Sequence, residues 1–138
     1  MVLENSGSLF KGFDKDSGSG NPISDWKWLV ENGSEIRAFG TAENTDTVIH
    51  TVTTGKTFYV FGIFLGAQNN AAIALPTVSI EFANATIVSA NPGKLDGAHE
   101  YQTFNLSVPI IVASGTAIEI TSNKASCFAR GSIIGYEI

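Results

Sequence analysis

Charged side chains are scarce in this sequence of 138 residues. They make up 15% of it, against about 25% in an average globular protein. The eight Lys and Arg residues form no cluster and the formal net charge is −5, which argues against nucleic acid as a partner. No run of about 18 apolar residues is present either, so we expect no membrane span. A surface this poor in charge favours association, and we predict a homo-oligomer.

Catalytic and redox signatures are also missing. The single Cys127 excludes an intrachain disulfide, and the apolar run around it indicates a buried, inert thiol. The sequence contains no Gly-x-Ser-x-Gly elbow, no His-Glu-x-x-His motif and no phosphate-binding loop. A glycosidase needs two convergent carboxylates, yet Glu81, Glu119 and Glu137 each stand alone on a predicted strand. We therefore predict no catalytic residue, no cofactor and no enzymatic activity.

The N-terminal part differs in composition from the rest of the chain. Residues 1–24 contain few large apolar groups and much Gly, Ser and Asp, which is typical of an extended arm. We expect this arm to contact a neighbouring subunit through Phe10 and Phe13, the alternative being a terminus without contacts. Residues 25–138 are expected to form a single β-sandwich domain. Met1–Gly12 has neither a basic n-region nor an apolar h-region, so we expect no secretory signal peptide.

The arm contains one candidate metal site, in the segment Asp14–Asn21. Asp14 and Asp16 place carboxylates at alternate positions before glycines, as in calcium-binding loops. The segment departs from an EF-hand loop because Gly18 has no side-chain oxygen and Ser19 stands where the turn glycine belongs. We therefore favour a solvated loop, with a calcium site at Asp14 and Asp16 as the alternative.

The stretch around Asn32-Gly33 has two interpretations. Asn-Gly is a strong hairpin signal, and we favour a hairpin that turns at these two residues. The alternative is a helical turn that is capped by Ser24 and ended by Gly33. Trp26 and Trp28 are interpreted as a hydrophobic plug, with a platform that stacks on sugar rings as the alternative.

The segment Gly55–Gly66 predicts a long central strand that is apolar on both faces. Strict alternation places one set of side chains toward the sandwich core, namely Phe58, Val60 and Phe64. The opposite set is then the predicted interface with another chain or segment, namely Tyr59, Phe61, Ile63 and Leu65. The central strand would therefore combine a core face with a contact face.

The rest of the chain predicts an all-β fold. We count roughly eight to ten short strands between turns rich in Gly, Asn and Pro, with almost no helical period. This pattern is typical of an antiparallel β-sandwich or barrel, and we predict a jelly roll. In the strand Thr103–Val112, alternation places Phe104, Leu106 and Val108 inward, and Pro109 indicates an edge strand or a bend. His50 has no second metal ligand nearby in the sequence and is interpreted as a structural histidine.

Three segments carry a resemblance to known proteins: Val52–Val60 (Val-Thr-Thr-Gly-Lys-Thr-Phe-Tyr-Val), Val108–Ile120 (Val-Pro-Ile-Ile-Val-Ala-Ser-Gly-Thr-Ala-Ile-Glu-Ile) and Gly135–Ile138. A valine-rich strand, a Gly-Lys turn, an aromatic strand and a Pro-Ile to Gly-Thr hairpin follow one another in this order. The chain thereby resembles small β-sandwich structural proteins of phages and other viruses, of the head-decoration, fibre or tail-tip type. Thr53-Thr54 departs from the pattern, in which Pro-Ala would precede the Gly-Lys.

The resemblance implies a function without chemistry. It implies a virion structural or assembly protein, such as a capsid decoration or stabilising protein, which contacts copies of itself and other virion proteins. A trimer is one candidate oligomer, and the protein would be assembled into the virion in the host cytoplasm. The alternative is a carbohydrate-binding module or lectin-like β-sandwich, because the jelly roll also serves such proteins.

Overall fold

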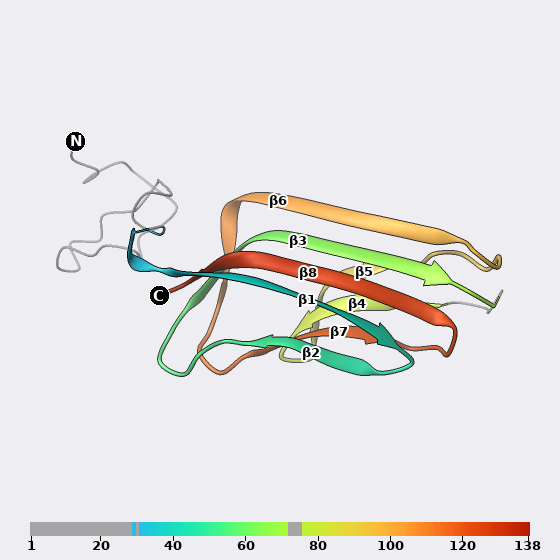
Figure 1. Ribbon diagram of the computed structural model, residues 1–138, viewed down its shortest axis with the longest axis horizontal. Helices are drawn as coiled ribbons and strands as arrows, with labels where there is room; N and C mark the ends of the chain where they lie inside the picture. The colour runs from blue at the N-terminus through green and yellow to red at the C-terminus, as the bar shows by residue number, and fades with distance from the viewer. Residues whose placement is uncertain (1–28, 30, 72–75) are drawn as a thin grey trace. The chain divides into compact units, whose positions relative to one another are not determined.

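The described part of the chain is a sandwich of two β-sheets. The structure is a computed structural model that describes residues 29, 31–71 and 76–138. One of its two units, Glu35–Glu137, contains all but the first residue of the sandwich. The strands of this part are β1 (Ser34–Glu43), β2 (Asp46–Thr51), β3 (Phe58–Asn69), β4 (Val78–Phe82), β5 (Ala85–Ala90), β6 (His99–Val112), β7 (Ala117–Ser122) and β8 (Cys127–Glu137). Figure 1 shows β1, β8, β3 and β6 in one layer and the remaining strands in the other.

The strand order is that of a jelly roll. One antiparallel sheet runs β1-β8-β3-β6 and the other β2-β7-β4-β5. Every connection passes from one sheet to the other except the tight turn between β4 and β5, where Ala83 and Asn84 both have positive φ, as type I′ hairpin turns require. Pairs of strands therefore wrap around a common core, as in other eight-stranded jelly rolls. The predicted all-β, antiparallel jelly-roll sandwich is confirmed.

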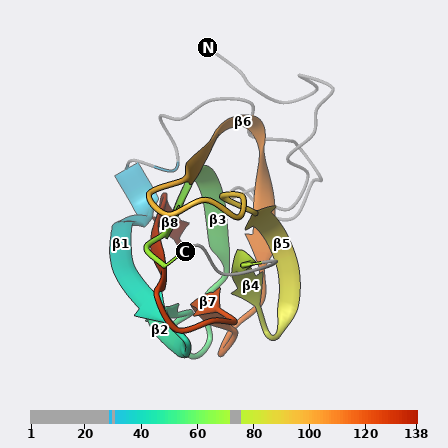
Figure 2. The same cartoon turned by 90° about the vertical axis from the view of Figure 1, so that its right-hand side faces the viewer.

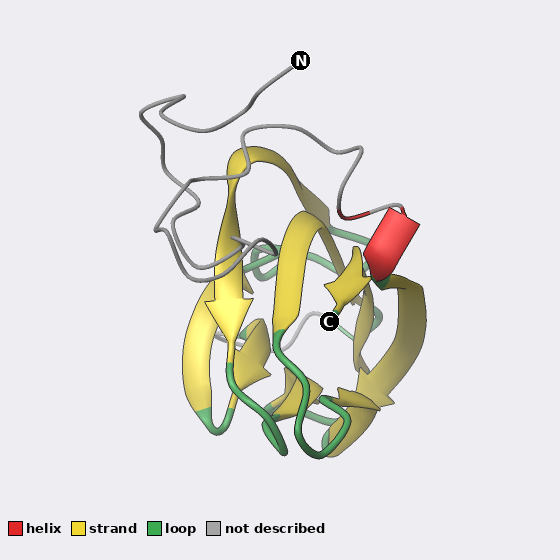
Figure 3. Ribbon diagram, turned by 90° about the vertical axis from the view of Figure 1, so that its left-hand side faces the viewer, coloured by secondary structure: helices red, strands yellow, loops and turns green. Residues whose placement is uncertain are grey.

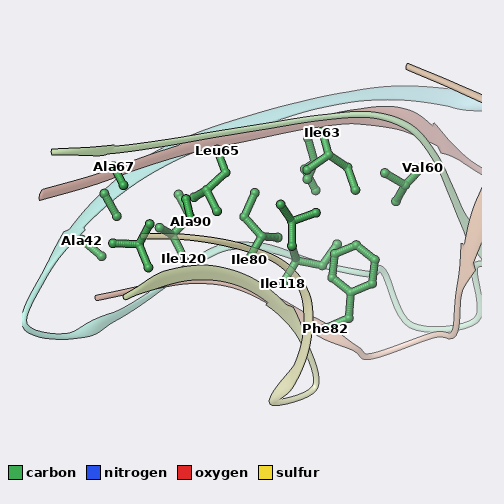
Figure 4. Packing of buried hydrophobic residues seen from close by; sticks show 14 of the residues in the cluster. Ala42, Val60, Ile63, Leu65, Ala67, Ile80, Phe82, Ala90, Ile118 and Ile120 are labelled. Atoms are coloured by element: carbon green, nitrogen blue, oxygen red, sulfur yellow. The ribbon is translucent and has the colours of Figure 1, made fainter. Parts of the chain in front are cut away.

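The core lies between the sheets and uses every second residue of the strands. In β8 buried and more exposed residues alternate along the whole strand. Figure 4 shows Leu65 and Ile63 of β3 opposite Ile80 and Ile118 of the other sheet. Cys127 is fully buried, as predicted, and burial raises the pKa of its thiol. A single apolar layer of this kind is the main source of stability in a two-sheet domain.

A bulge in β3 interrupts the alternation. The register of β3 with both β6 and β8 shifts between Val60 and Gly62. Opposite β8, Phe61 is an additional residue of β3, because Val60 pairs with Gly135 and Gly62 with Ile134. Phe58 and Val60 face the core before the bulge, and Ile63 and Leu65 face it afterwards. Phe61 is itself buried but does not belong to the core cluster between the sheets.

The face assignment of the central strand is therefore wrong beyond Val60. Ile63 and Leu65, which alternation assigns to an interface, are core residues with at most 3% of their surface exposed. Phe64, which alternation assigns to the core, lies on the outer face of the sheet, half-buried. The physical reason is that one additional residue in a strand reverses the side to which every later side chain points.

The favoured hairpin at Asn32-Gly33 is also wrong. Leu29, Glu31 and Asn32 are helical, and the Gly33 N–H donates to the Leu29 carbonyl at 2.7 Å, the i to i−4 bond of an α-helix. Figure 3 shows this short helical segment before the first strand. Asn-Gly can end a helix as well as turn a hairpin, so the dipeptide alone does not separate the two. Trp26 and Trp28, like the predicted arm, lie outside the described residues.

The bulge predicts that truncating Ile63 destabilises the fold more than truncating Phe64. Ile63→Ala should lower the free energy of unfolding by about 2–5 kcal/mol, because it leaves a cavity in the core. Phe64→Ala should cost less than about 2 kcal/mol, because its ring is half-buried on the outer face. Denaturant titration measures both values, with Ser132→Ala, the cross-strand neighbour of Phe64, as a control expected near zero. A larger loss for Phe64→Ala than for Ile63→Ala would contradict the bulge.

Candidate functional site

The exposed apolar side chains of the described residues gather on one side of the sandwich. Nine large apolar residues are exposed, and five of these lie on β5 and β6. β5 and β6 are edge strands of the two sheets, and Figure 2 shows them on the same side, opposite β1 and β2. We name this side the neutral edge, and its exposed apolar residues are Ile87, Tyr101, Phe104, Val108 and Ile111.

The neutral edge is nearly free of charge. β5 and β6 contain no Lys or Arg, and Glu100 is their single acidic residue. Its carboxylate accepts hydrogen bonds from the Asn91 N–H at 2.7 Å and from the Gln102 amide at 2.6 Å. The opposite side differs, because β1 alone carries Glu35, Arg37 and Glu43. The two sides of the sandwich therefore differ in charge.

The long edge strand β6 is bent in the middle. Asn105 pairs with Gly62 and Ile110 with Val60, so residues 106–109 stand outside the regular pairing with β3. Pro109 lies in this bend, and the prediction that its strand is an edge strand or bends is confirmed on both counts. Edge strands are commonly protected by Lys, Pro or a bulge. In β6 the Pro and the bend protect only one half, and residues 99–105 remain regular.

Next to the neutral edge, the outer face of the β1-β8-β3-β6 sheet is rich in aromatic residues. The Phe64 ring stacks on the exposed Tyr101 ring, with centroids 6.0 Å apart and an angle of 20° between the planes. One cross-strand row of this face consists of Tyr136, Tyr59 and Ile111 from β8, β3 and β6. Burial raises the pKa of the Tyr59 hydroxyl. Apolar surface thus continues from the neutral edge onto the outer face.

The predicted interface residues lie in three different places. Tyr59 and Phe61 are buried outside the core cluster, and their role as interface residues stays a prediction. Ile63 and Leu65 belong to the core, as described above. The remaining predicted site residues lie outside the described residues and stay predictions, namely Phe10, Phe13, Asp14, Asp16, Trp26 and Trp28.

The prediction for β6 is right about the side of Phe104 and wrong about its burial. Phe104 pairs with the core residue Ile63, so it lies on the core side of the sheet as predicted, but 39% of its surface is exposed. Leu106 and Val108, also predicted to face the core, lie in the bend, where Leu106 is half-buried and Val108 is 45% exposed. The core has little room for them because β6 is the last strand of its sheet. Pro109 was the available signal, since an edge strand can alternate apolar and polar residues without burying either set.

A buried polar pair joins the two sheets at one end of the sandwich. His50 Nε2 of β2 lies 2.7 Å from Glu137 Oε1 of β8, and the Thr53 N–H donates to the same oxygen at 3.0 Å. Only 3% of the Glu137 side chain is exposed, and the His50 ring meets the Phe58 ring edge-on. His50 is thus hydrogen-bonded within the fold, as a structural histidine would be. Burial by itself raises the pKa of Glu137, but hydrogen bonds from Thr53 and His50 outweigh burial and leave this pKa below its ordinary value.

Two carboxylates that stand apart in the sequence meet on the second sheet. Glu81 of β4 and Glu119 of β7 are direct cross-strand neighbours, so the expectation that each stands alone is wrong for this pair. The hydroxyls of Ser79 and Thr86 donate to Glu81. Like charges directly opposite one another are destabilising, and these hydrogen bonds offset part of that cost.

Among the described residues, no group of three or more His, Cys, Asp or Glu side chains could hold a metal ion. None of the helices there has the length and apolar character that crossing a membrane requires.

Comparison with known proteins gives likenesses in structure only. No protein-family model and no curated protein matches the chain. A chain in the acidic stable capsid structure of Helicobacter pylori bacteriophage KHP30 superimposes with a TM-score of 0.53 and 14% sequence identity, over 75% of this chain and 92% of that chain. The chain therefore has the fold of a phage capsid chain. A chain in the capsid asymmetric unit of cyanophage Pam1 gives a TM-score of 0.47 and 15% identity, over 75% of this chain and 85% of that one.

The hydrogen bonds of Glu137 to His50 and Thr53 predict that the stability of the fold depends on pH. Because the folded pKa of Glu137 lies below its unfolded value, its contribution to stability is complete above the ordinary glutamate pKa of about 4.3 and is lost as the pH falls through the folded pKa. At pH 7, Glu137→Gln should cost about 1–3 kcal/mol, because it weakens the bonds to His50 and to Thr53. Urea titrations of both proteins from pH 7 down to pH 3 measure the difference.

The control for this prediction is Asp96→Asn, which changes an exposed carboxyl in the loop between β5 and β6. The difference between wild type and Glu137→Gln should shrink with falling pH, while the Asp96→Asn difference stays small. A Glu137→Gln difference that is constant across the range would contradict the lowered pKa.

Proposed function

We propose that this protein is a non-enzymatic structural component of a virus particle, a decoration or stabilising protein that binds a protein shell through its neutral edge. The observation that carries the proposal is the neutral edge itself, where Ile111 and Tyr101 are each more than 60% exposed on strands without Lys or Arg. Soluble monomers rarely expose large contiguous apolar surfaces. Burying such a surface stabilises a complex by about 25 cal/mol per Å² of apolar area.

Three further observations support the proposal. The fold is similar to that of a chain in a phage capsid structure, and the likeness extends over 92% of that chain, so the shared part is nearly the whole of it. Charged residues make up only 15% of the sequence. The open edge of β6 can also accept a partner strand, which adds backbone hydrogen bonds to apolar burial. A protein that acts in this way needs no catalytic residue.

The proposal includes partners and location. Copies of the chain and other virion proteins would contact the neutral edge and the outer face, and the protein would reside in the virion. This function does not include binding of nucleic acid, because the net charge of −5 would repel its phosphates.

Carbohydrate binding is the second candidate, and one observation favours it. Tyr101 is 61% exposed, its ring stacks on the Phe64 ring, and the centroid of the His99 ring lies 5.3 Å from that of Tyr101. A rigid exposed aromatic ring of this kind can stack on the face of a sugar. Tyr101→Ala should abolish glycan binding if this function is correct. If the shell-binding function is correct, the wild type and Tyr101→Ala should both give only background signals on a glycan array.

Ile111 offers a direct test of shell binding. Ile111→Asp places a charge on the neutral edge without touching the core, so the variant should fold but bind the shell at least about 100-fold more weakly. The measurement is co-sedimentation of purified protein with virus particles assembled without it, as a function of protein concentration.

The matched control is Phe39→Asp, which introduces the same charge at an exposed apolar position of β1, on the opposite side of the sandwich. Its binding should equal that of the wild type, and both variants should keep the wild-type melting temperature within a few degrees. Equal binding by Ile111→Asp and wild type, or no binding by wild type, would refute the proposal.

A further inference from the structure

The regular half of β6 presents a row of backbone groups that can pair with another strand. β6 is the last strand in the order β1-β8-β3-β6, so within the described residues its outer N–H and C=O groups have no strand partner. Residues 99–105 keep an unbroken register with residues 62–68 of β3. This half of the strand is therefore straight, regular and open on one side.

The other edge strands are less suited to pairing. β1 carries Glu35, Arg37 and Glu43 along its length, and β2 begins with Asp46. β5 spans only six residues and its register with β4 shifts between Ile80 and Glu81. Charges, short length and bulges are the features that keep natural edge strands from associating. Residues 99–105 have none of them except Glu100, whose carboxylate is already hydrogen-bonded.

We propose that this half of β6 pairs antiparallel with the same segment of a second copy, which joins two β1-β8-β3-β6 sheets into one continuous sheet of eight strands. The inference rests on the proposed function and deepens it, because it names one partner of the neutral edge as the chain itself. Two copies that each carry a net charge of −5 repel each other. They can approach most closely where the surface is neutral, and residues 99–105 provide such a place.

The geometry of antiparallel pairing also fits two identical copies. A two-fold axis perpendicular to the sheet keeps Tyr101 of both copies on the outer face and Phe104 of both copies on the other face. Tyr101 makes one face of β6 apolar and Phe104 makes the other face apolar. The best partner for β6 is therefore a strand that is also apolar on both faces. An isologous contact of this kind closes after two copies and leaves residues 110–112 of each copy available for the shell.

The test uses the full-length protein and its mass in solution. Sedimentation equilibrium of the wild type at about 0.1 mM should give twice the chain mass of 14.6 kDa. Thr103→Lys places two like charges near the two-fold axis, so the dimer should dissociate at least about 100-fold more readily and the mass should fall to 14.6 kDa. The matched control is Thr41→Lys, at an exposed position of the opposite edge strand β1, which should remain dimeric.

Hydrogen exchange identifies the segment independently. The amides of residues 99–105 that point away from β3 should exchange more slowly in concentrated than in dilute wild-type protein. Thr103→Lys should remove this difference while the melting temperature is kept. A wild-type monomer at about 0.1 mM, a trimer, or a dimer that Thr41→Lys dissociates and Thr103→Lys does not would each overturn the inference.

The outcome is separable from that of the proposed function. A dimer that meets these criteria but does not co-sediment with particles supports the inference and refutes shell binding. A wild-type monomer that does co-sediment, and is released by Ile111→Asp, supports shell binding and overturns the inference.

Discussion

Burial of β3 on both of its faces is the constraint on which the rest of the sandwich depends. On the core side the strand packs Phe58, Val60, Ile63 and Leu65 against the second sheet, and on the outer side it buries Tyr59 and Phe61. The bulge at Phe61 makes this possible, because the additional residue turns the later large aliphatic side chains inward. It also brings Gly62 and Gly66 to the outer face, where Ile134 and Tyr101 from the neighbouring strands lie directly against them. A side chain at either glycine would displace this cover.

The same arrangement decides where the surface is charged. The sheet that contains β3 has two unlike edge strands. β1 carries Glu35, Arg37 and Glu43, whereas β6 carries almost no charge. A protein with 15% charged residues cannot protect all of its surface by charge. In this jelly roll β1 alone carries three charged residues, whereas β5 and β6 together carry one, so the side formed by β5 and β6 stays apolar. A surface of this kind favours assembly over solubility, and the proposed role in a particle uses it.

Much of the fold could be predicted from the sequence, and the errors have local causes. The two-residue period holds between β4 and β7, whose mutual register is unbroken, and it brings Ile80 and Ile118 into the core. Alternation failed for Ile63 and Phe64, because a bulge leaves no mark in the hydrophobic pattern when both faces are apolar. It placed Phe104 on the correct side, opposite the core residue Ile63, but could not show that Phe104 stays exposed, because β6 is an edge strand. The His50–Glu137 pair joins residues 87 positions apart, and nothing in a single sequence links such residues.

The sequence by itself determined the class of the protein: an all-β jelly roll, poor in charge, with an apolar central strand and an edge or bend at Pro109. These properties follow from composition and from the two-residue period of strands, which act locally. Only the tertiary structure decided which residues face the core after Phe61 and that the neutral strands β5 and β6 share one side. It also decided that Glu81 meets Glu119. The physical reason is that strand register and strand neighbours are set by contacts between distant segments, so the surface available to a partner exists only once the sheets have formed.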